Sequence, residues 1–414
     1  MDRVILHSDL NNFYASVECM LHPELKDKCV AVCGSEENRH GIVLAKNEAA
    51  KKLGVKTAET IWQAKAKCPH LEIVSPHFEE YAKYSKLVRQ IYMQYTDLIE
   101  PFGLDECWLD VTGSRLLFGD GVTIAEKIRR EVKEKTGLTV SVGVSFNKVF
   151  AKLGSDLKKP DAVTEISRDN FKEKVWHLPA DSIIGVGKST YKRLSDFGIH
   201  TIGDIAAASH EFFKTHFGKA GTMLWQYANG LDESPVRHQD YKPPAKSIGH
   251  GLTLKSDLEN YEEVWRVLFH LCRSLENSLR KQNVLAASCA VSVKDSELKV
   301  REFQTPLKCA THSAYEIAGQ LFALFKQKYV WSKNVRALTV RAVKLSGEDD
   351  EVQMSLFSDE QPDEKRERME RAAYELENKF GKGTVTFGSL MANDKLPFND
   401  DEEDSRELYK NFKK

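Results

Sequence analysis

Strand-like segments that alternate with helical ones constrain the fold of the first 165 residues more than any other feature of the chain. Residues 4–8 form a short β-branched run that ends at Asp9, and residues 11–19 follow at once with a helical spacing of apolar side chains. The alternation continues, with expected strands at 30–33, 42–44, 98–102, 107–111 and 140–144 and expected helices at 47–53, 81–95 and 121–136. Such alternation indicates an α/β or α+β core.

The rest of the sequence divides into parts of different character. Residues 168–235 contain short helical stretches separated by glycines, which predicts a small all-helical domain. The adjacent prolines Pro243 and Pro244 predict a semi-rigid linker. After the linker, expected helices at 261–280 and 314–329 and expected strands at 287–293 and 338–343 indicate a sheet with two helices. From residue 347 onward, acidic residues predict a flexible tail that contains a helix-like stretch at 366–380.

The net charge conceals a separation of charge along the chain. Over 414 residues, 60 Lys and Arg against 61 Asp and Glu give a net charge of −1, which by itself argues weakly against a nucleic-acid binder. Residues 246–346, however, hold 16 basic against 9 acidic residues, whereas residues 347–414 hold 11 against 19. A basic domain is what a polyanion binder needs, and a well-solvated surface is the alternative for a surplus of this size.

The cysteines and the termini bear on the compartment. The eight cysteines contain no Cys-x-x-Cys pair, and Cys29 and Cys33 have no matching His or Cys pair at the spacing of a zinc site. We therefore expect buried or free thiols in a reducing compartment. The N-terminus is too acidic for a signal peptide, and no apolar run approaches the length of a membrane span. The sequence predicts a cytoplasmic protein with no membrane partner.

Three carboxylates lie where chemistry could take place. Asp9 ends the first expected strand, and Asp105 and Glu106 lie between two strand-like stretches at 100–104 and 107–111. An acidic pair inside an apolar hairpin is costly unless it is paired or bound to a metal. If the hairpin lies beside the first strand, the three carboxylates meet at a site suited to Mg²⁺ and phosphoryl transfer. The alternative is an ordinary turn, where an Asp-Glu pair is common.

Three motifs carry a resemblance to a known family. They lie at residues 7–18 (HSDLNNFYASVE), 103–110 (GLDECWLD) and 141–153 (SVGVSFNKVFAKL), the last followed by DLKKP at 156–160. In order and spacing, over roughly residues 1–346, the sequence closely resembles the Y-family DNA polymerases of the bacterial DinB type. The resemblance implies a multidomain α+β fold, a right-hand polymerase with palm and fingers, a helical helix-hairpin-helix thumb and an α/β little-finger domain.

The resemblance also implies where these domains begin and end. We expect a palm at residues 1–167 with fingers inserted at about 20–77, a thumb at 168–235 and a linker at 236–245. A little finger is then expected at 246–346, and an acidic tail with a clamp-binding peptide at 353–357 occupies the remaining residues 347–414.

The family chemistry implies roles for the carboxylates. Asp9, Asp105 and Glu106 match the metal-binding carboxylates, Glu106 matches the residue usually called catalytic, and Leu10 is expected to supply its backbone carbonyl. In this chemistry the primer 3′-hydroxyl attacks the α-phosphate of a deoxynucleoside triphosphate and pyrophosphate leaves. Of two Mg²⁺ ions, one lowers the pKa of the hydroxyl and the other neutralises the triphosphate. Asp110 is interpreted as a strand-end or turn residue outside the site.

Other positions of the motifs imply nucleotide contacts. Tyr14 matches the steric gate, a ring that would clash with the 2′-hydroxyl of a ribonucleotide, although an aromatic on an amphipathic helix is more often part of the core. Lys159 matches a lysine that reaches the triphosphate. Where the family has a tyrosine and an arginine that contact the triphosphate, this chain has Glu48 and Lys51. Lys51 can supply charge without the bidentate fork of arginine, so the departure bears on nucleotide affinity rather than on the reaction.

Two further segments resemble parts that hold DNA or a partner. Gly185, Gly187 and Lys188 lie in a helix-hairpin-helix whose backbone amides and helix N-terminus would contact a DNA phosphate. In the tail, the sequence QMSLF at 353–357 resembles the peptide with which bacterial polymerases bind their sliding clamp, with contacts from Gln353, Leu356 and Phe357.

The motifs therefore predict a template-directed, low-fidelity DNA polymerase that copies past damaged template bases. Its expected cofactor is a pair of Mg²⁺ ions, its expected partners are primer–template DNA, deoxynucleoside triphosphates and the sliding clamp, and we expect a monomer. A palm-type nucleotidyl cyclase is one alternative, although a cyclase needs neither the thumb hairpin nor the basic domain. The other is a non-catalytic DNA-binding or clamp-associated scaffold descended from a polymerase, which the three carboxylates oppose and Glu48 mildly favours.

Overall fold

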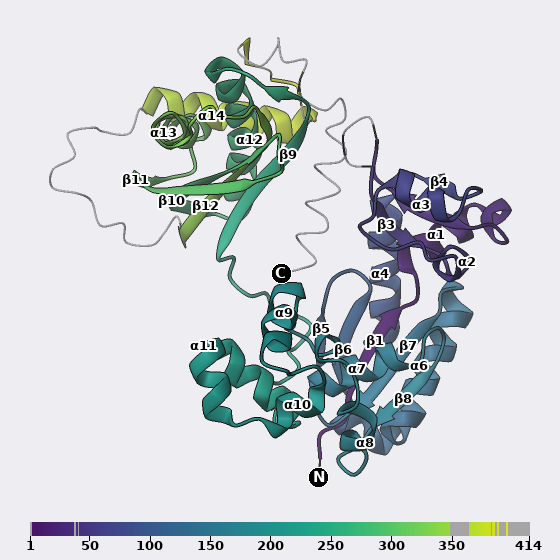
Figure 1. The fold of residues 1–414 in the computed structure, drawn as a ribbon. Helices are drawn as coiled ribbons and strands as arrows, with labels where there is room; N and C mark the ends of the chain where they lie inside the picture. Colours follow the sequence, from purple (N-terminus) through teal and green to yellow (C-terminus); the bar gives the residue numbers. More distant parts are fainter. Residues whose placement is uncertain are drawn as a thin grey trace. The chain divides into compact units, whose positions relative to one another are not determined.

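The computed structural model describes residues 2–36, 39, 41–347, 364–381, 383–385, 387–388 and 395. The chain forms two compact units, and the boundary between them falls after Lys242, at the start of the Pro243-Pro244 pair (Figure 1). Each unit is described by itself. Within the described part of the chain, no helix is long and apolar enough to cross a membrane.

A five-stranded mixed sheet forms the centre of the first unit. Its order is β5-β6-β1-β7-β8, and the strands are β1 (Ile5–Leu10), β5 (Ile99–Pro101), β6 (Glu106–Asp110), β7 (Val140–Ser145) and β8 (Val163–Ile166). The central strand β1 is antiparallel to both β6 and β7, whereas β7 and β8 are parallel. Every residue of β1 and β7 is buried, as expected for strands with helices on both faces.

Helices cover both faces of this sheet. The helices α1 (Phe13–Leu21), α4 (Phe78–Tyr92) and α6 (Gly121–Thr136) contribute side chains to the apolar core on one face. Helix α7 (Lys148–Leu157) packs against β1, β7 and β8 on the other. The short elements η1 (Pro23–Leu25), η2 (Thr112–Ser114) and α5 (Arg115–Phe118) complete the surroundings of the sheet.

Alternation along β1 divides its side chains between the two faces of the sheet. Successive residues of a strand point to opposite sides of the sheet. Leu6 and Leu10 therefore enter the core formed with α4 and α6. Ile5, His7 and Asp9 point to the side of α7, where Ile5 packs against Ala151 of that helix. The face of the sheet beneath α7 thus carries His7 and Asp9, whereas Ser8 lies on the other face, with its Oγ 2.8 Å from the hydroxyl of Tyr92 of α4.

Gly143 lets α7 lie close to the sheet. It is paired with His7 across β1 and β7, and a Cβ atom added to it would lie 1.8 Å from the backbone oxygen of Ala151 and 2.5 Å from the backbone nitrogen of Ser155. The helix begins at a capping residue, Asn147, whose side chain accepts a hydrogen bond from the backbone N–H of Phe150 at 2.7 Å. The absence of a side chain at residue 143 therefore sets how near the helix approaches the sheet.

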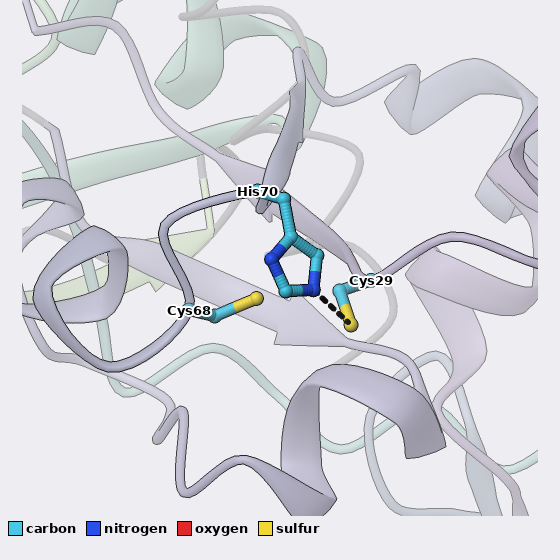
Figure 2. A group of neighbouring side chains, drawn as sticks. All are labelled: Cys29, Cys68 and His70. Atoms are coloured by element: carbon cyan, nitrogen blue, oxygen red, sulfur yellow. Dashed lines mark hydrogen bonds between the residues drawn. The ribbon is translucent and has the colours of Figure 1, made fainter.

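A smaller layer follows α1 in the first unit. Its three-stranded sheet has the order β3-β2-β4, with β2 (Val30–Cys33), β3 (Val43–Lys46) and β4 (Glu72–Val74), and its helices are α2 (Glu48–Lys52) and α3 (Ile61–Lys67). Its core is built mainly from small side chains, among them Ala31, Ala50 and Ala64. Cys29, Cys68 and His70 gather beside this sheet (Figure 2).

The first unit ends in a helical part, as the glycine pattern predicts. Its elements are α8 (Phe171–Val175), η3 (Ala180–Ser182), α9 (Lys188–Asp196), α10 (Ile202–Ala207) and α11 (His210–Ala228). Two residues interrupt or begin helices here. Gly218 breaks α11 with non-helical angles (φ 61°, ψ −144°), and Thr201 forms a capping box with Asp204 at the start of α10.

The second unit is an antiparallel sheet with two helices. Its strands and helices follow one another as β9 (Ser247–Leu258), α12 (Tyr261–Lys281), β10 (Val284–Asp295), β11 (Val300–Thr311), α13 (Ala314–Lys328) and β12 (Val335–Gly347), and the sheet order is β11-β10-β12-β9. One apolar core unites both helices with the strands. The sequence predicts the helices and parts of β10 and β12, whereas β9 and β11 were not expected from it.

A further helix, α14 (Glu364–Phe380), packs on the second unit. Glu377 forms an ion pair of 2.7 Å with Arg273 of α12, and the buried Glu370 accepts a hydrogen bond from the backbone N–H of Tyr315 at 3.2 Å. The helix expected at 366–380 is present, but the flexibility expected of the tail does not extend to it, because its acidic side chains are partners of buried basic and backbone groups.

Replacing Gly143 by alanine tests the seating of α7. Because the new Cβ would meet backbone atoms of the helix, which cannot rotate away, we expect Gly143→Ala to lower the free energy of unfolding by about 3 kcal/mol. Gly113→Ala is the matched control, since no atom lies within 4 Å of its added Cβ. Thermal and urea unfolding of both variants measure the effect. Equal stability of the two variants would contradict the close seating of the helix.

Candidate active site

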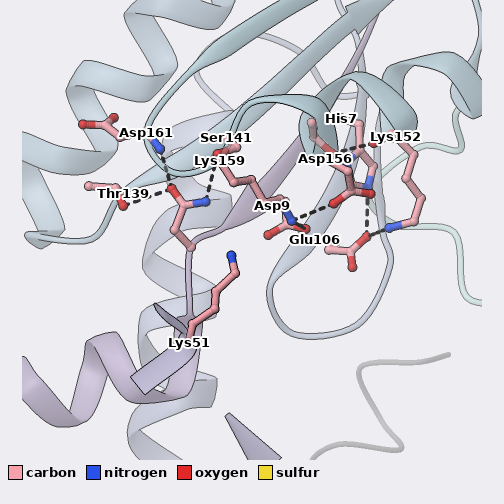
Figure 3. Close-up of polar contacts among 12 residues, drawn as sticks. His7, Asp9, Lys51, Glu106, Thr139, Ser141, Lys152, Asp156, Lys159 and Asp161 are labelled. Carbon is pink, nitrogen blue, oxygen red and sulfur yellow. Dashed lines mark hydrogen bonds and ion pairs between the residues drawn. The ribbon is translucent and has the colours of Figure 1, made fainter. Parts of the chain in front are cut away.

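The strand register brings Asp9 and Glu106 side by side. Asp9 of β1 is the direct partner of Glu106 of β6, and His7 is the partner of Trp108 two residues away. Asp105 immediately precedes β6, and its backbone oxygen accepts a hydrogen bond from the N–H of Leu10 at 3.0 Å. The hairpin therefore does lie beside the first strand, and the three carboxylates expected to meet are brought to one end of the β1–β6 pair. Figure 3 shows two of them, Asp9 and Glu106.

Helix α4 holds the turn that carries Asp105. Gly103 adopts φ +91°, a left-handed conformation that other residues rarely adopt. The backbone oxygen of Gly103 accepts a hydrogen bond from Arg89 at 2.8 Å, and that of Leu104 accepts one from the buried hydroxyl of Ser85. Both donors lie on α4, so the position of Asp105 is set by packing of that helix as well as by the strands.

Burial makes two of the carboxylates hard to ionise without a cation. Burial raises the pKa of Asp9 to about 6, although the Lys159 ammonium opposes this increase. Burial, together with the charges of Asp9 and Glu106, raises the pKa of Asp105 to about 7. Two neighbouring acids thus repel each other at the end of the strand pair.

Glu106 is the carboxylate that stays ionised. Its Oε2 lies 3.0 Å from Nε2 of the buried His7 and also contacts the Lys152 ammonium of α7. Burial opposes ionisation, but the contacts with His7 and Lys152 lower the pKa of Glu106 to about 2. His7 itself is held through Nδ1, which lies 2.8 Å from Oγ of Ser155, and burial lowers the pKa of His7.

Lys159 joins Asp9 to the end of α7. Its ammonium lies 2.8 Å from Oδ2 of Asp9 and 2.7 Å from Oδ1 of Asp156. Burial disfavours the charged form of Lys159, but the two carboxylates raise its pKa, so the side chain remains a cation beside Asp9. The lysine that the motifs point to is therefore at the carboxylate cluster.

Asn11 is a residue of the site that the sequence reasoning missed. Its amide N–H donates to Ser141 Oγ at 2.9 Å, and its Oδ1 accepts hydrogen bonds from Thr139 Oγ1 at 3.0 Å and from the backbone N–H of Asp161 at 2.9 Å. It thereby connects the end of β1 to the loop that carries Lys159. His7 and Lys152 were missed as well. Their position within the quoted motifs was the available signal.

The residues fit a divalent cation of the hard kind. All three side chains offer carboxylate oxygens, the donors that Mg²⁺ prefers. The raised pKa values of Asp9 and Asp105 mean that the fold places negative charge where the two lysines do not fully compensate it. A bound cation would remove this cost of ionisation.

Tyr14 presents a fixed ring near the start of α1. Its ring stacks on that of Tyr81 from α4, with centroids 4.2 Å apart and planes 9° from parallel. Tyr14 is partly exposed, whereas the neighbouring Phe13 is buried, with an exposed fraction of 3 %. Phe13 is thus the core aromatic of this helix, and Tyr14 keeps an accessible side.

The replaced positions of the nucleotide motif lie on α2. Glu48 Oε1 accepts hydrogen bonds from Asn12 at 3.0 Å and from Lys51 at 3.3 Å. Burial opposes its ionisation, but Asn12 and Lys51 lower the pKa of Glu48. The carboxylate that should repel a triphosphate is therefore engaged by neighbours, and Figure 3 draws Lys51 without a contact to the carboxylate cluster.

The residues expected to contact a DNA phosphate lie at the start of α9. Gly185 (φ +95°), Gly187 and Lys188 are exposed there, Gly187 is the capping residue of the helix and Lys188 is its first residue. The expected clamp contacts Gln353, Leu356 and Phe357 lie outside the described residues.

Comparison with protein families matches most of the chain in three pieces. Residues 8–156 match the impB/mucB/samB family, and residues 245–356 match the C-terminal domain of that family. Residues 181–232 match a thumb domain described for DNA polymerase-iota.

Individual relatives match nearly end to end. A DNA polymerase IV of Acetivibrio thermocellus is 52% identical over 94% of this chain and 98% of its own length. DNA polymerase IV of Clostridium acetobutylicum is 32% identical over 94% of this chain and 99% of the relative. Among solved structures, a chimeric Y-family DNA polymerase superposes with a TM-score of 0.74 and 26% identity, covering 83% of this chain and 99% of the chimera.

Proposed function

This chain belongs to the impB/mucB/samB family of DNA polymerases, and we propose how its own residues add nucleotides to a primer. The chain is a DNA-directed DNA polymerase that copies past damaged template bases, and its fold is that of a right-hand polymerase, as the motifs predicted. Both alternatives, the cyclase and the non-catalytic scaffold, lose their support. Glu48, which favoured the scaffold, has its charge engaged by Asn12 and Lys51.

The pairing of Asp9 with Glu106 carries the proposal for the active site. Asp9, Asp105, Glu106 and the backbone carbonyl of Leu10 would hold two Mg²⁺ ions. When bound, these ions would supply a lower pKa for the primer 3′-hydroxyl and positive charge for the triphosphate. The chain's own contribution is to hold Glu106 ionised through His7 and Lys152. The primer end and the nucleotide would meet beside Glu106 and Asp9.

We assign the positioning of the triphosphate to two lysines. Lys159 lies beside Asp9 and Asp156, so its ammonium can move to a phosphate oxygen while it stays within the same polar cluster. Lys51 on α2 would supply a second positive charge. Asn11 would act as a positioning residue, because it connects the loop of Lys159 to β1.

The domains expected from the motifs become proposals on the two units. The first unit would contain the palm at 1–167, with fingers at about 20–77, and the thumb at 168–235. The boundary after Lys242 lies inside the proposed linker 236–245, which supports the little finger as a separate unit at 246–346. In the thumb, the exposed Gly185, Gly187 and Lys188 would contact a DNA phosphate at the N-terminus of α9.

Partners beyond primer–template DNA and nucleotides are proposed from the tail. Gln353, Leu356 and Phe357 would bind the bacterial sliding clamp. This peptide lies in the segment between β12, which ends at Gly347, and α14, which begins at Glu364. A monomer in the cytoplasm remains the proposed state.

Primer extension with Mg²⁺ on undamaged and lesion-bearing templates tests the active site. We expect the wild type to extend primers and Asp105→Ala to be slower by at least about 100-fold, because the variant loses a metal-binding carboxylate. Asp110→Asn is the matched control. Asp110 shares the strand β6 but holds Thr112 instead, so near-normal extension is expected.

DNA binding, measured in parallel, separates the outcomes. A wild type that binds primer–template but does not extend it would restore the scaffold. Extension by Asp105→Ala at the wild-type rate would remove Asp105 from the site.

Sugar discrimination tests Tyr14. We expect Tyr14→Ala to raise ribonucleotide incorporation relative to deoxyribonucleotide incorporation by at least about 10-fold, because it removes the ring that excludes the 2′-hydroxyl. Tyr14→Phe keeps the ring stacked on Tyr81 and should retain discrimination. Single-nucleotide incorporation kinetics measure the ratio. Unchanged discrimination in Tyr14→Ala would rule the residue out as the gate.

A further inference from the structure

Three side chains of the kinds that bind metals, two cysteines and one histidine, converge beside the three-stranded sheet. Cys29 directly precedes β2, Cys68 ends α3, and His70 lies in the turn that leads to β4. One ligand atom from each of the three lies within 4.8 Å of the other two, and Cys29 Sγ is 3.9 Å from His70 Nε2 (Figure 2). We propose that Cys29, Cys68 and His70 bind a zinc ion.

The backbone holds the three residues in place. β2 and β4 pair in parallel, and the N–H of Glu72 donates to the Cys29 oxygen at 2.8 Å. The N–H of Leu71 donates to the Cys68 oxygen at 3.0 Å, which forms the tight turn that places His70 beside Cys68. Residues 39 positions apart in sequence are thus adjacent because of strand pairing, which is why the spacing in the sequence did not reveal them.

The observed separations need little change to become a coordination sphere. With Zn–S bonds of about 2.3 Å and Zn–N bonds of about 2.0 Å, ligand atoms of a tetrahedral site lie about 3.5–3.8 Å apart. The 3.9 Å between Cys29 Sγ and His70 Nε2 is already near this value. Cys68 is buried and Cys29 partly buried, whereas His70 is exposed, so its imidazole can rotate to complete the geometry.

The donor set selects the metal. Two thiolates and one imidazole suit zinc and other borderline or soft ions, whereas Mg²⁺ prefers oxygen donors. Two thiolates would neutralise the charge of Zn²⁺, so the partly buried site would carry no net charge. Among the described residues no fourth Cys, His, Asp or Glu joins the group, so the fourth position would hold water.

The surrounding core explains what the ion would do. Five of the nine buried side chains in the apolar core of this layer are alanine or cysteine, which bury little area each. Cys68 belongs to that core and Cys29 packs against it. A zinc ion would fasten the beginning of β2 to the turn between α3 and β4, and would thereby stabilise a layer with a small core.

Metal retention by the full-length chain without a polyhistidine tag tests the proposal. The reduced protein is stripped of metal, incubated with Zn²⁺ in excess Mg²⁺ to occupy the carboxylate cluster, and freed of unbound ions by gel filtration. We expect about one zinc per chain in the wild type and in Cys19→Ser, a matched partly buried thiol outside the group. Cys29→Ser, Cys68→Ser and His70→Asn should lose it.

Two further readouts protect the test against misfolding. His70 is exposed, so His70→Asn should fold even if Cys68→Ser does not, and zinc should raise the melting temperature of the wild type but not of His70→Asn. Co²⁺ in place of zinc should give a thiolate charge-transfer band that both cysteine variants lack. The proposal is overturned if the reduced wild type retains no zinc, if His70→Asn retains as much as the wild type, or if Cys29 and Cys68 form a disulfide and the reduced pair binds no metal.

Discussion

The close contact between α7 and the central strands is the constraint on which the rest of the site depends. Because Gly143 carries no side chain, the helix approaches the face of the sheet that bears His7 and Asp9. That approach brings Lys152 to Glu106, Ser155 to His7 and, just beyond the helix, Lys159 to Asp9. A larger residue at 143 would displace the groups that balance the charge of the carboxylates, although it touches none of them.

Neighbouring basic groups compensate the charge of Glu106, but they compensate the charges of Asp9 and Asp105 only in part. Glu106 has a histidine and a lysine beside it, and its pKa falls to about 2. Asp9 has one lysine and a pKa raised to about 6, and Asp105 has a pKa raised to about 7. Burial without enough neighbouring cations raises the free energy of the ionised carboxylates, and binding of a divalent cation would lower it again.

Local patterns in the sequence predicted much of this fold, and tertiary contacts decided what they did not predict. The strand at 30–33 and the helix at 121–136 have the predicted bounds, because apolar periodicity, the Asp120 cap and the terminal Gly137 act locally. The carboxylates were predicted from motifs and from their place at strand ends. Lys152 and Asn11 were missed because their roles depend on how α7 and the loop after it pack. The docking of α14 was not predicted, because its partners, such as Arg273, lie about 100 residues away in the sequence.

The central claim, that the buried carboxylates are a divalent-cation site built by the fold, is tested most directly by thermal unfolding with and without Mg²⁺. Burial raises the pKa of Asp105 above its unfolded value, so the stability it contributes is present at low pH and is lost as the pH rises through about 7. Mg²⁺ should therefore raise the melting temperature relative to a chelator, and more at pH 8 than at pH 6. Asp105→Asn should melt higher than the wild type in the chelator and respond less to Mg²⁺, while Asp110→Asn responds normally. The account would be contradicted if Mg²⁺ did not change the melting temperature of the wild type at pH 8. It would also be contradicted if Mg²⁺ raised the melting temperature of Asp105→Asn as much as that of the wild type.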